Sequence, residues 1–241
     1  MANPYFQFKQ FTVWHDLCAM KVGTDGVLLG AWASVEGRRR ILDVGTGTGL
    51  IALMAAQRNG ETLIDAVEID ADAARQAEAN FAASPWADRL HVILSDFSRF
   101  DSGQRYDLIV SNPPYFESSL TSPGRQRTLA RHTASLPFEA LIASARSLLA
   151  EGGLLALVYP ADADERIRSL AIEAGLRPRR RLAVRGTPDA PVKRVLAEYE
   201  LRQVASPMPE HEERAELTVE LARHEYTLEY IALTRAFYLK M

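Results

Sequence analysis

The sequence predicts an α/β fold built on an open, doubly wound, mostly parallel sheet of seven strands. Short apolar runs alternate with segments of helical periodicity through most of the chain. A glycine-rich turn follows the first of these runs. Near the C-terminus, the turn-rich segment GTPDAP (186–191) joins two strand-like runs, which predicts a hairpin that adds an antiparallel strand to the sheet.

Five apolar runs predict the parallel strands: RILDVG (40–45), TLIDAVEID (62–70), LHVILSD (90–96), YDLIVSN (106–112) and LLALVYP (154–160). The helices are expected at LIALMAAQRNG (50–60), DAARQAEANFAAS (72–84, capped by Asp70 or Asp72), FEALIASARSLLAEGG (138–153, closing at Gly152 and Gly153) and ERIRSLAIEAG (165–175). The hairpin strands are expected at RRRLAVR (179–185) and VKRVLAEYELR (192–202), and a last helix at YTLEYIALTRAFYLKM (226–241). Strands and helices alternating at this spacing imply right-handed crossovers, with helices on both faces of the sheet.

The composition is that of an ordinary soluble globular protein, and 241 residues suffice for one sizeable α/β domain. No apolar run is long enough to span a membrane, and MANPYFQFKQF (1–11) lacks the features of a secretion signal, so we expect a cytoplasmic protein. The single cysteine, Cys18, excludes an intrachain disulfide and a cysteine-cluster zinc site. Neither His15 nor His132 has a metal-ligand partner at a useful spacing, so no metal is expected.

A glycine-rich turn, DVGTGTG (43–49), comes directly after the first predicted strand. Open parallel sheets bind ligands beyond the carboxyl ends of their strands, so a cofactor is expected here. The dinucleotide pattern G-x-G-x-x-G needs a third glycine where this chain has Leu50, so a nicotinamide cofactor fits poorly. The acid and glycines at Asp43, Gly45, Gly47 and Gly49 resemble instead the first motif of class I S-adenosylmethionine methyltransferases.

Acidic residues end three successive predicted strands: Asp43, Glu68 and Asp96. The resemblance implies that all three hold the cofactor, with Glu68 accepting hydrogen bonds from two ribose hydroxyls. Asp96 would meet the adenine amino group, with Phe97 beside it. Each acid taken alone is better explained by a solvated turn residue or a helix cap. Three strand ends with an acid, and the glycine turn at the first, favour the cofactor role.

The stretch SNPPYF (111–116) ends the fourth strand, because two consecutive prolines supply no N–H to a sheet. Asn112 is then expected beside the first strand, at the crevice where the methyl group of the cofactor would point. Its side-chain oxygen and the carbonyl of Pro113 would each accept one N–H of a planar amino group and hold its nitrogen in line. The turn through Pro113 and Pro114 fixes the carbonyl direction, and Tyr115 offers a face on which a base can stack. This is positioning and transition-state complementarity rather than base catalysis. A proline turn with a buried tyrosine is the alternative for this tetrapeptide alone.

The segment FKQFTVWHDLCAMKVGTDGVLLGAWA (8–33) closely resembles the N-terminus of the bacterial tRNA1(Val) adenine N6-methyltransferase family. The resemblance extends through DVGTGTGLIALMAAQR, VEID, SNPPYF, ARH and the closing LTRAFYLKM, so it covers most of the chain. It implies a Rossmann-like class I methyltransferase fold, S-adenosylmethionine as cofactor and the adenosine at position 37, just 3′ of the anticodon, as target. KVGTD lies beside the cofactor in that family, which implies contacts from Lys21, Thr24 and Asp25. We expect a single methyltransferase domain over residues 1–241, in which residues 1–38 precede the first core strand and cover the cofactor, residues 39–200 form the core and residues 201–241 form an extension.

Basic residues follow the proline stretch without an acid among them, although the net charge of the chain is −3. Arg125, Arg127, Arg131 and His132 are expected to reach phosphates that flank a flipped base in a tRNA loop. A second cluster lies in RPRRRLAVR (177–185) and would extend this footprint. For each arginine singly, a solvated surface charge is an equal alternative.

Other functions share the proline motif. One is methylation of a release-factor glutamine; those enzymes usually carry an added N-terminal helical domain, for which about forty residues before the glycine turn are too few. Another is amino methylation of ribosomal RNA or of DNA, the latter disfavoured because no target-recognition domain follows the motif. A noncatalytic RNA-binding protein that keeps the fold is the third, and the intact motif speaks against it.

Overall fold

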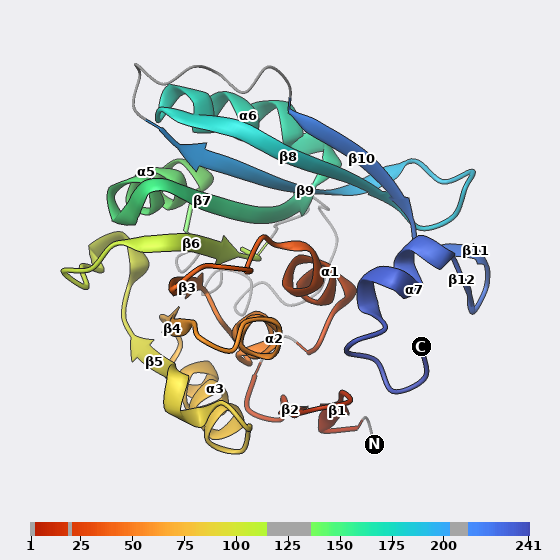
Figure 1. Ribbon diagram of the computed structural model, residues 1–241, viewed down its shortest axis with the longest axis horizontal. Coiled ribbons are helices and arrows are strands. Elements are labelled where there is room, and N and C mark those ends of the chain that lie inside the picture. The colour runs from red at the N-terminus through yellow and green to blue at the C-terminus, as the bar shows by residue number, and fades with distance from the viewer. Residues whose placement is uncertain (1–2, 19–20, 115–135, 203–211) are drawn as a thin grey trace, which may run out of the picture.

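The computed structural model of the protein describes residues 3–18, 21–114, 136–202 and 212–241. Its centre is an eight-stranded sheet that forms the middle layer in Figure 1. From one edge to the other, its strands are β10 (Glu213–Thr218), β8 (Leu176–Arg185), β9 (Val192–Leu201), β7 (Leu149–Pro160), β6 (Tyr106–Ser111), β3 (Arg40–Val44), β4 (Leu63–Glu68) and β5 (Leu90–Leu94). The predicted α/β class is confirmed, as is the hairpin formed by β8 and β9.

Within the described sheet, β9 alone runs against its neighbours, β7 and β8. All other adjacent strands pair in parallel. The sheet has one strand more than the seven expected, because β10 adds to its edge beside β8. In β10 only Leu217 is buried, so the strand lacks the apolar run by which the other strands are recognised.

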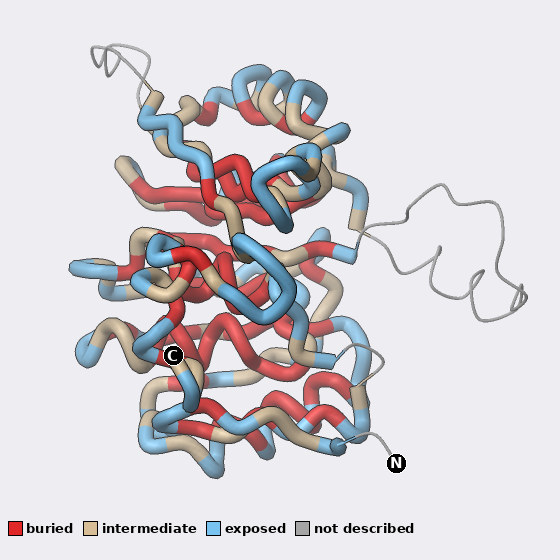
Figure 2. Tube along the Cα trace, turned by 90° about the vertical axis from the view of Figure 1, so that its right-hand side faces the viewer, coloured by how far each residue is buried: buried red, intermediate tan, exposed pale blue. Residues whose placement is uncertain are grey.

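Helices cover both faces of the sheet. One face carries α1 (Thr24–Trp32), α2 (Leu50–Arg58), α3 (Ala71–Ala82) and α7 (Leu228–Thr234), and the other carries α5 (Phe138–Leu148) and α6 (Asp164–Glu173). Successive residues of β6 alternate between these two cores: Leu108 and Val110 pack in the first and Ile109 in the second, as the period of a strand requires. Figure 2 shows the buried residues concentrated between the helical layers.

The chain ends lie against the first core. The strands β1 (Tyr5–Gln7) and β2 (Thr12–Trp14) form an antiparallel hairpin, and Phe8 pairs with Tyr238 through an isolated bridge. A second small hairpin consists of β11 (Glu220–Ala222) and β12 (Glu225–Tyr226). Short 3-10 helices occur at η1 (Ala87–Arg89), η2 (Phe97–Arg99) and η3 (Ala161–Ala163). No helix in the described part of the chain has the length and apolar character needed to cross a membrane.

Two helices end earlier than their sequences suggest. Helix α5 stops at Leu148, and strand β7 begins at Leu149, before the glycine pair. Gly153 lies within β7, where the pairing with β6 shifts register. A Cβ at this position would lie 2.9 Å from the Tyr106 carbonyl oxygen, so the close approach of the two strands requires glycine. Helix α7 stops at Thr234, whose hydroxyl donates to the Tyr230 carbonyl.

Candidate active site

A cavity of about 1310 Å³ opens beyond the carboxyl ends of β3, β4 and β6. Because β4 and β6 lie on opposite sides of β3, it sits where the strand order reverses, which is the usual ligand site of a doubly wound sheet. Its walls come from the turn after each strand, from the start of α1 and from the N-terminal segment before α1. Among the predicted site residues, its lining includes Lys21, Thr24, Asp25, Gly45, Gly47, Glu68, Asp96, Phe97, Asn112, Pro113 and Pro114.

The glycine turn curls over the end of β3. Gly45 and Gly47 have φ of 68° and 55°, in the left-handed region that favours glycine. The N–H groups of Gly45 and Thr46 donate to the Val67 carbonyl of β4, at 2.8 and 3.2 Å. No heavy atom lies within 4 Å of where a Cβ would stand at Gly45 or Gly47, so the turn leaves open space beside its backbone.

Two residues predicted to hold the cofactor, Asp43 and Gly49, are not part of the cavity lining. Asp43 is fully buried under the turn, where its Oδ2 accepts from the Thr46 hydroxyl at 2.6 Å and from the Ala52 N–H at 3.2 Å. Gly49 caps α2, and a Cβ there would lie 2.4 Å from the Phe81 ring. The contacts made by both residues shape the turn and the start of α2.

Burial has the largest effect on the pKa of Asp43. Desolvation, with a smaller contribution from the nearby Glu68 carboxylate, raises the pKa of its carboxyl to about 7 against the opposing effect of the two hydrogen bonds. Its second oxygen, Oδ1, is buried with no hydrogen-bond partner among the described residues. Because Oδ1 has no partner there, the neutral form of the Asp43 carboxyl avoids the cost of burying an unpaired charge.

Glu68 ends β4 and holds the turn from the side. Its Oε2 accepts from the Gly47 N–H at 2.9 Å, and its Oε1 accepts from the N–H groups of Ile69 and Asp70, also at 2.9 Å. A carboxylate has about four acceptor positions, so these three bonds leave capacity for a ligand hydroxyl. Asp70 is the N-cap of α3, as expected, and accepts from the N–H groups of Asp72 and Ala73.

Asp96 and Phe97 follow β5. The N–H and hydroxyl of Ser98 both donate to Asp96 Oδ1, and these bonds lower the pKa of the Asp96 carboxyl. The carboxylate is therefore ionised at neutral pH and open to the cavity, since its side chain is 40% exposed. Phe97 is buried in the second core, close to Phe100, so only part of its ring reaches the cavity wall.

Asn112, Pro113 and Pro114 form the wall that leads out of β6. The strand end is fixed by the Ser111 hydroxyl, which donates to the Val44 carbonyl of β3 at 2.8 Å. Pro113 is buried and Pro114 is exposed. A Cβ at Gly26 would lie 3.8 Å from Asn112 Nδ2, so the first turn of α1 faces this amide. Tyr115 lies outside the described residues.

The N-terminal residues Lys21, Thr24 and Asp25 line the opposite wall. Asp25 is tied to the sheet, because Arg194 Nε of β9 donates to its Oδ2 at 2.8 Å. This ion pair anchors the start of α1, which lines the cavity, to strand β9.

The predicted RNA-binding residues Arg125, Arg127, Arg131 and His132 lie outside the described residues. The second arginine cluster is largely engaged inside the protein. Arg181 binds Asp164 at 2.6 Å and Arg185 binds Glu216 at 2.6 Å. Both arginines therefore have an intramolecular ion-pair partner that the sequence did not predict.

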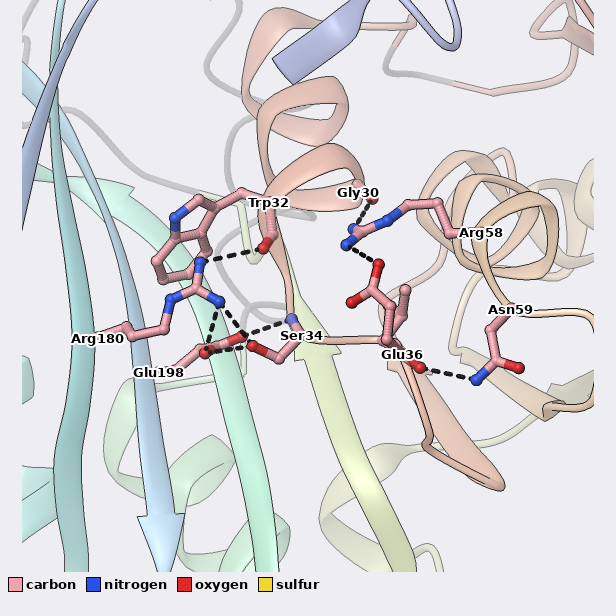
Figure 3. Close-up of polar contacts among 9 residues, drawn as sticks. Gly30, Trp32, Ser34, Glu36, Arg58, Asn59, Arg180 and Glu198 are labelled. Carbon is pink, nitrogen blue, oxygen red and sulfur yellow. Dashed lines mark hydrogen bonds and ion pairs between the residues drawn. The ribbon is translucent and has the colours of Figure 1, made fainter. Parts of the chain in front are cut away.

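Arg180 is the third member of the cluster that is held within the fold. As Figure 3 shows, its guanidinium lies over the Trp32 ring and beside the buried Glu198 carboxylate. It donates to the Ser34 hydroxyl at 2.7 Å, and Glu198 accepts from the Ser34 N–H and hydroxyl. The network joins β8 and β9 to the end of α1, and therefore fixes the helix whose start forms the cavity wall.

Other cavity residues were not predicted from sequence. Leu17 and Cys18 in the N-terminal segment, and Ile69 after Glu68, all line the cavity. Ile69 could have been found from its place beside the strand-end acid. Leu17 and Cys18 belong to the segment expected to cover the cofactor, but the sequence did not single them out; the Leu17 N–H donates to Gln76 of α3, more than fifty residues away.

The site fits S-adenosylmethionine. The open space beside Gly45 and Gly47 lets a ligand approach the main chain of the turn closely. A side chain at either position would occupy that space. Glu68 and Asp96 offer acceptors for hydroxyl and amino groups, and Ile69 and Phe97 add apolar surface to the lining. No group of three or more His, Cys, Asp or Glu side chains among the described residues is arranged to hold a metal ion.

The methyltransferase small domain family matches residues 23–165 of the chain. A relative from Parabacteroides distasonis, named tRNA1(Val) (adenine(37)-N6)-methyltransferase, is 54% identical over the full length of both proteins. Relatives of the same name from Flavobacterium johnsoniae and Trichodesmium erythraeum are 48% and 44% identical, and the matches cover 98% and 100% of this chain and 100% of each relative.

Solved structures share the fold at low sequence identity. A predicted O-methyltransferase from Agrobacterium tumefaciens matches with a TM-score of 0.68 at 18% identity, over 88% of this chain and 96% of that one. The N-methyltransferase NodS from Bradyrhizobium japonicum, solved with S-adenosyl-L-homocysteine, matches with a TM-score of 0.52 at 17% identity, over 74% and 86% of the two chains. These matches establish that the sheet and its helices form a methyltransferase fold.

Proposed function

Because the chain belongs to the methyltransferase small domain family and, within it, to the family of tRNA1(Val) (adenine(37)-N6)-methyltransferases, we propose that it methylates N6 of adenosine 37 in tRNA1(Val). S-adenosylmethionine is the cofactor. Relatives of this name that match over their full lengths support the substrate, and the cavity beyond the carboxyl ends of the strands supports the reaction class.

One observation carries the proposal: Asn112 and Pro113 open into the same cavity as the glycine turn and Glu68. The adenine amino group is a weak nucleophile, because its lone pair is delocalised into the ring. The Asn112 side-chain oxygen and the Pro113 carbonyl would each accept one of its N–H groups, which favours a pyramidal nitrogen. These acceptors stabilise the positive charge that develops on the nitrogen, so no strong base is required at this step.

S-adenosylmethionine supplies an electrophilic methyl group on a sulfonium. Glu68 would hold its ribose and Asp96 its adenine, with Phe97 packed beside the ring. The backbone of Gly45 and Gly47 and the side chains of Lys21, Thr24 and Asp25 would contact the remainder. Asp43 and Gly49 would support the site indirectly, by holding the glycine turn in shape. The bond of Asp43 to the Ala52 N–H and the close approach of Gly49 to the Phe81 ring support this role.

The size of the cavity supports two occupants. Pockets for one small molecule measure roughly 300–1,000 Å³, and this cavity is about 1310 Å³. The additional room suits a base turned out of the anticodon loop. Tyr115 would stack on that base, and Arg125, Arg127, Arg131 and His132 would contact the flanking phosphates. We place this reaction in the cytoplasm.

The experiment that tests this function is methyl transfer from labelled S-adenosylmethionine to total tRNA from cells that lack the protein. Nucleoside analysis should then find the label in N6-methyladenosine. Unlabelled tRNA, with label on a release-factor glutamine instead, would contradict the proposal and favour the protein substrate. tRNA from cells that contain the protein is the matched control and should take up little label, because its target is already methylated.

A further inference from the structure

Two buried amides of α3 fasten the N-terminal segment to the cofactor cavity. We call residues 14–18 the strap. The N–H of Trp14 donates to Asn80 Oδ1 at 2.9 Å, and Asn80 Nδ2 donates back to the Trp14 carbonyl at 2.9 Å. One turn earlier on α3, Gln76 Oε1 accepts from the Leu17 N–H at 3.0 Å. The strap is therefore held at two points on one face of the helix.

Asn80 also contacts the glycine turn. Its Nδ2 donates a second hydrogen bond to the Thr48 carbonyl at 2.8 Å. One side chain thus joins the strap to the turn that shapes the cofactor site. Asn80 is 1% exposed and Gln76 is 3% exposed. Polar groups buried to this extent are costly unless paired, so their partners are strongly constrained.

The far end of the strap forms part of the cavity wall. Leu17 and Cys18 line the cavity together with Ile69, Asp70 and Asp72, all from the region between β4 and the first turn of α3. This is the side of the cavity next to Glu68. The side chain of Leu17 is otherwise unusually exposed for a large apolar residue, at 50%. An apolar ligand surface at this wall would cover it.

We propose that Asn80 is a positioning residue that couples the strap to the glycine turn, so that Leu17 and Cys18 close the wall of the cavity and retain the cofactor. Binding then orders the turn and the strap together. Without the Asn80 amide, the turn keeps Glu68 and Val67 as partners but loses its connection to the strap. The cofactor should dissociate faster, while the methyl-transfer step at Asn112 is unaffected.

The test compares Asn80→Ala with Glu78→Ala, a control on the exposed face of the same helix. Asn80→Ala should raise the dissociation rate of S-adenosylhomocysteine and the KM for S-adenosylmethionine by about tenfold. Its kcat at saturating cofactor should stay within about twofold of wild type, and Glu78→Ala should change neither parameter. A general loss of structure would lower kcat as well, so this split separates positioning from mere stability.

Cys18 provides an independent readout as the sole cysteine of the chain. Burial, with the nearby Glu68 carboxylate, raises the pKa of its thiol to about 11, so its alkylation at a fixed pH is slow and depends on exposure. S-adenosylhomocysteine should slow the alkylation of Cys18 in wild type, and this protection should be much weaker in Asn80→Ala. Equal protection in both proteins would overturn the proposal.

Gln76→Ala keeps the test decisive if Asn80→Ala fails to fold, because it removes the hydrogen bond to Leu17 and leaves both hydrogen bonds of Asn80 Nδ2 in place. It should raise the dissociation rate in the same direction, by a smaller factor than Asn80→Ala. Unchanged dissociation in Gln76→Ala would count against the strap. The proposal rests on the cofactor assignment alone. If wild type binds the cofactor and both variants release it at the wild-type rate, the role of the strap is overturned and the tRNA function stays intact.

Discussion

At the residue scale, side chains at the strand ends divide into those that face the cavity and those that support the turn from beneath. Glu68 and Asp96 line the cavity, whereas Asp43 is fully buried. The sequence predicted the same role for all three because each ends a strand. The direction of Asp43 depends on its bond to Ala52 in α2, nine residues further on, which the strand pattern does not reveal.

Asn112→Ala tests the central residue of the proposed reaction. Loss of the side-chain acceptor should lower kcat by about 100-fold or more, as loss of one preorganised transition-state partner does elsewhere. The KM for S-adenosylmethionine should change little. Asn112→Asp is the matched variant, since a carboxylate oxygen also accepts an N–H, and it should retain more activity than Asn112→Ala. Steady-state kinetics with tRNA measure both, and an Asn112→Ala enzyme with wild-type kcat would exclude the role.

Asp43 predicts a pH dependence of stability. Its pKa is raised from 3.8 to about 7 by folding, so the folded protein binds one more proton than the unfolded chain between these values. The free energy of unfolding should therefore fall as the pH rises through this window and level off above it. One pKa unit corresponds to about 1.4 kcal/mol, so the effect amounts to a few kcal/mol.

The measurement is urea unfolding of wild type and Asp43→Asn at about pH 5 and about pH 8. Asparagine preserves the acceptor for Thr46 and Ala52 but does not titrate. Wild type should lose stability relative to Asp43→Asn between the two conditions. Parallel pH profiles for the two proteins would show that Asp43 does not carry this proton.

At the element scale, long-range polar contacts anchor both ends of the helix α1 that lines the cavity. The start of α1 is fixed by Arg194 of β9, and its end by the network of Arg180, Ser34 and Glu198. The sequence predicted the strands that carry Arg180, Arg194 and Glu198, but it offered Arg180 as part of an RNA footprint, with a solvated surface charge as the equal alternative. Glu198 faces Arg180 across the predicted hairpin, but Trp32 and Ser34 lie more than 140 residues from Arg180 in sequence, so no local pattern identifies them as its partners.

Arg180→Ala should destabilise the protein by about 3 kcal/mol, because Glu198 would remain buried without its counter-charge. Arg179→Ala, at an exposed neighbouring position, should change stability by less than about 0.5 kcal/mol. Thermal unfolding of the two variants measures the difference. Below its unfolding transition, Arg180→Ala should keep the wild-type KM for tRNA; a large rise in that KM without loss of stability would restore Arg180 as an RNA contact.

At the scale of the whole molecule, the periodicity of apolar residues and the positions of turn residues predicted the doubly wound sheet, the hairpin near the C-terminus and the turns that meet at the cavity. The signals were strong because buried parallel strands are continuous apolar runs and their turns carry glycine, acid or proline. The N-terminal segment was expected over the cofactor, but two features that depend on context were missed: strand β10 and the contacts that bring the strap to the cavity. Strand β10 buries only Leu217, and the strap reaches the cavity through two amides of α3. Both depend on partners that the fold supplies.

The central claim is that Asn112 at the end of β6 directs a methyl group to adenosine 37 of tRNA1(Val). The most direct measurement is the mass of the anticodon-loop fragment of tRNA1(Val) from cells that lack the protein and express either wild type or Asn112→Ala. Wild type should restore the mass of one methyl group on adenosine 37, and equal amounts of Asn112→Ala should not. A fragment left unmethylated by wild type, or fully methylated by Asn112→Ala, would contradict the account.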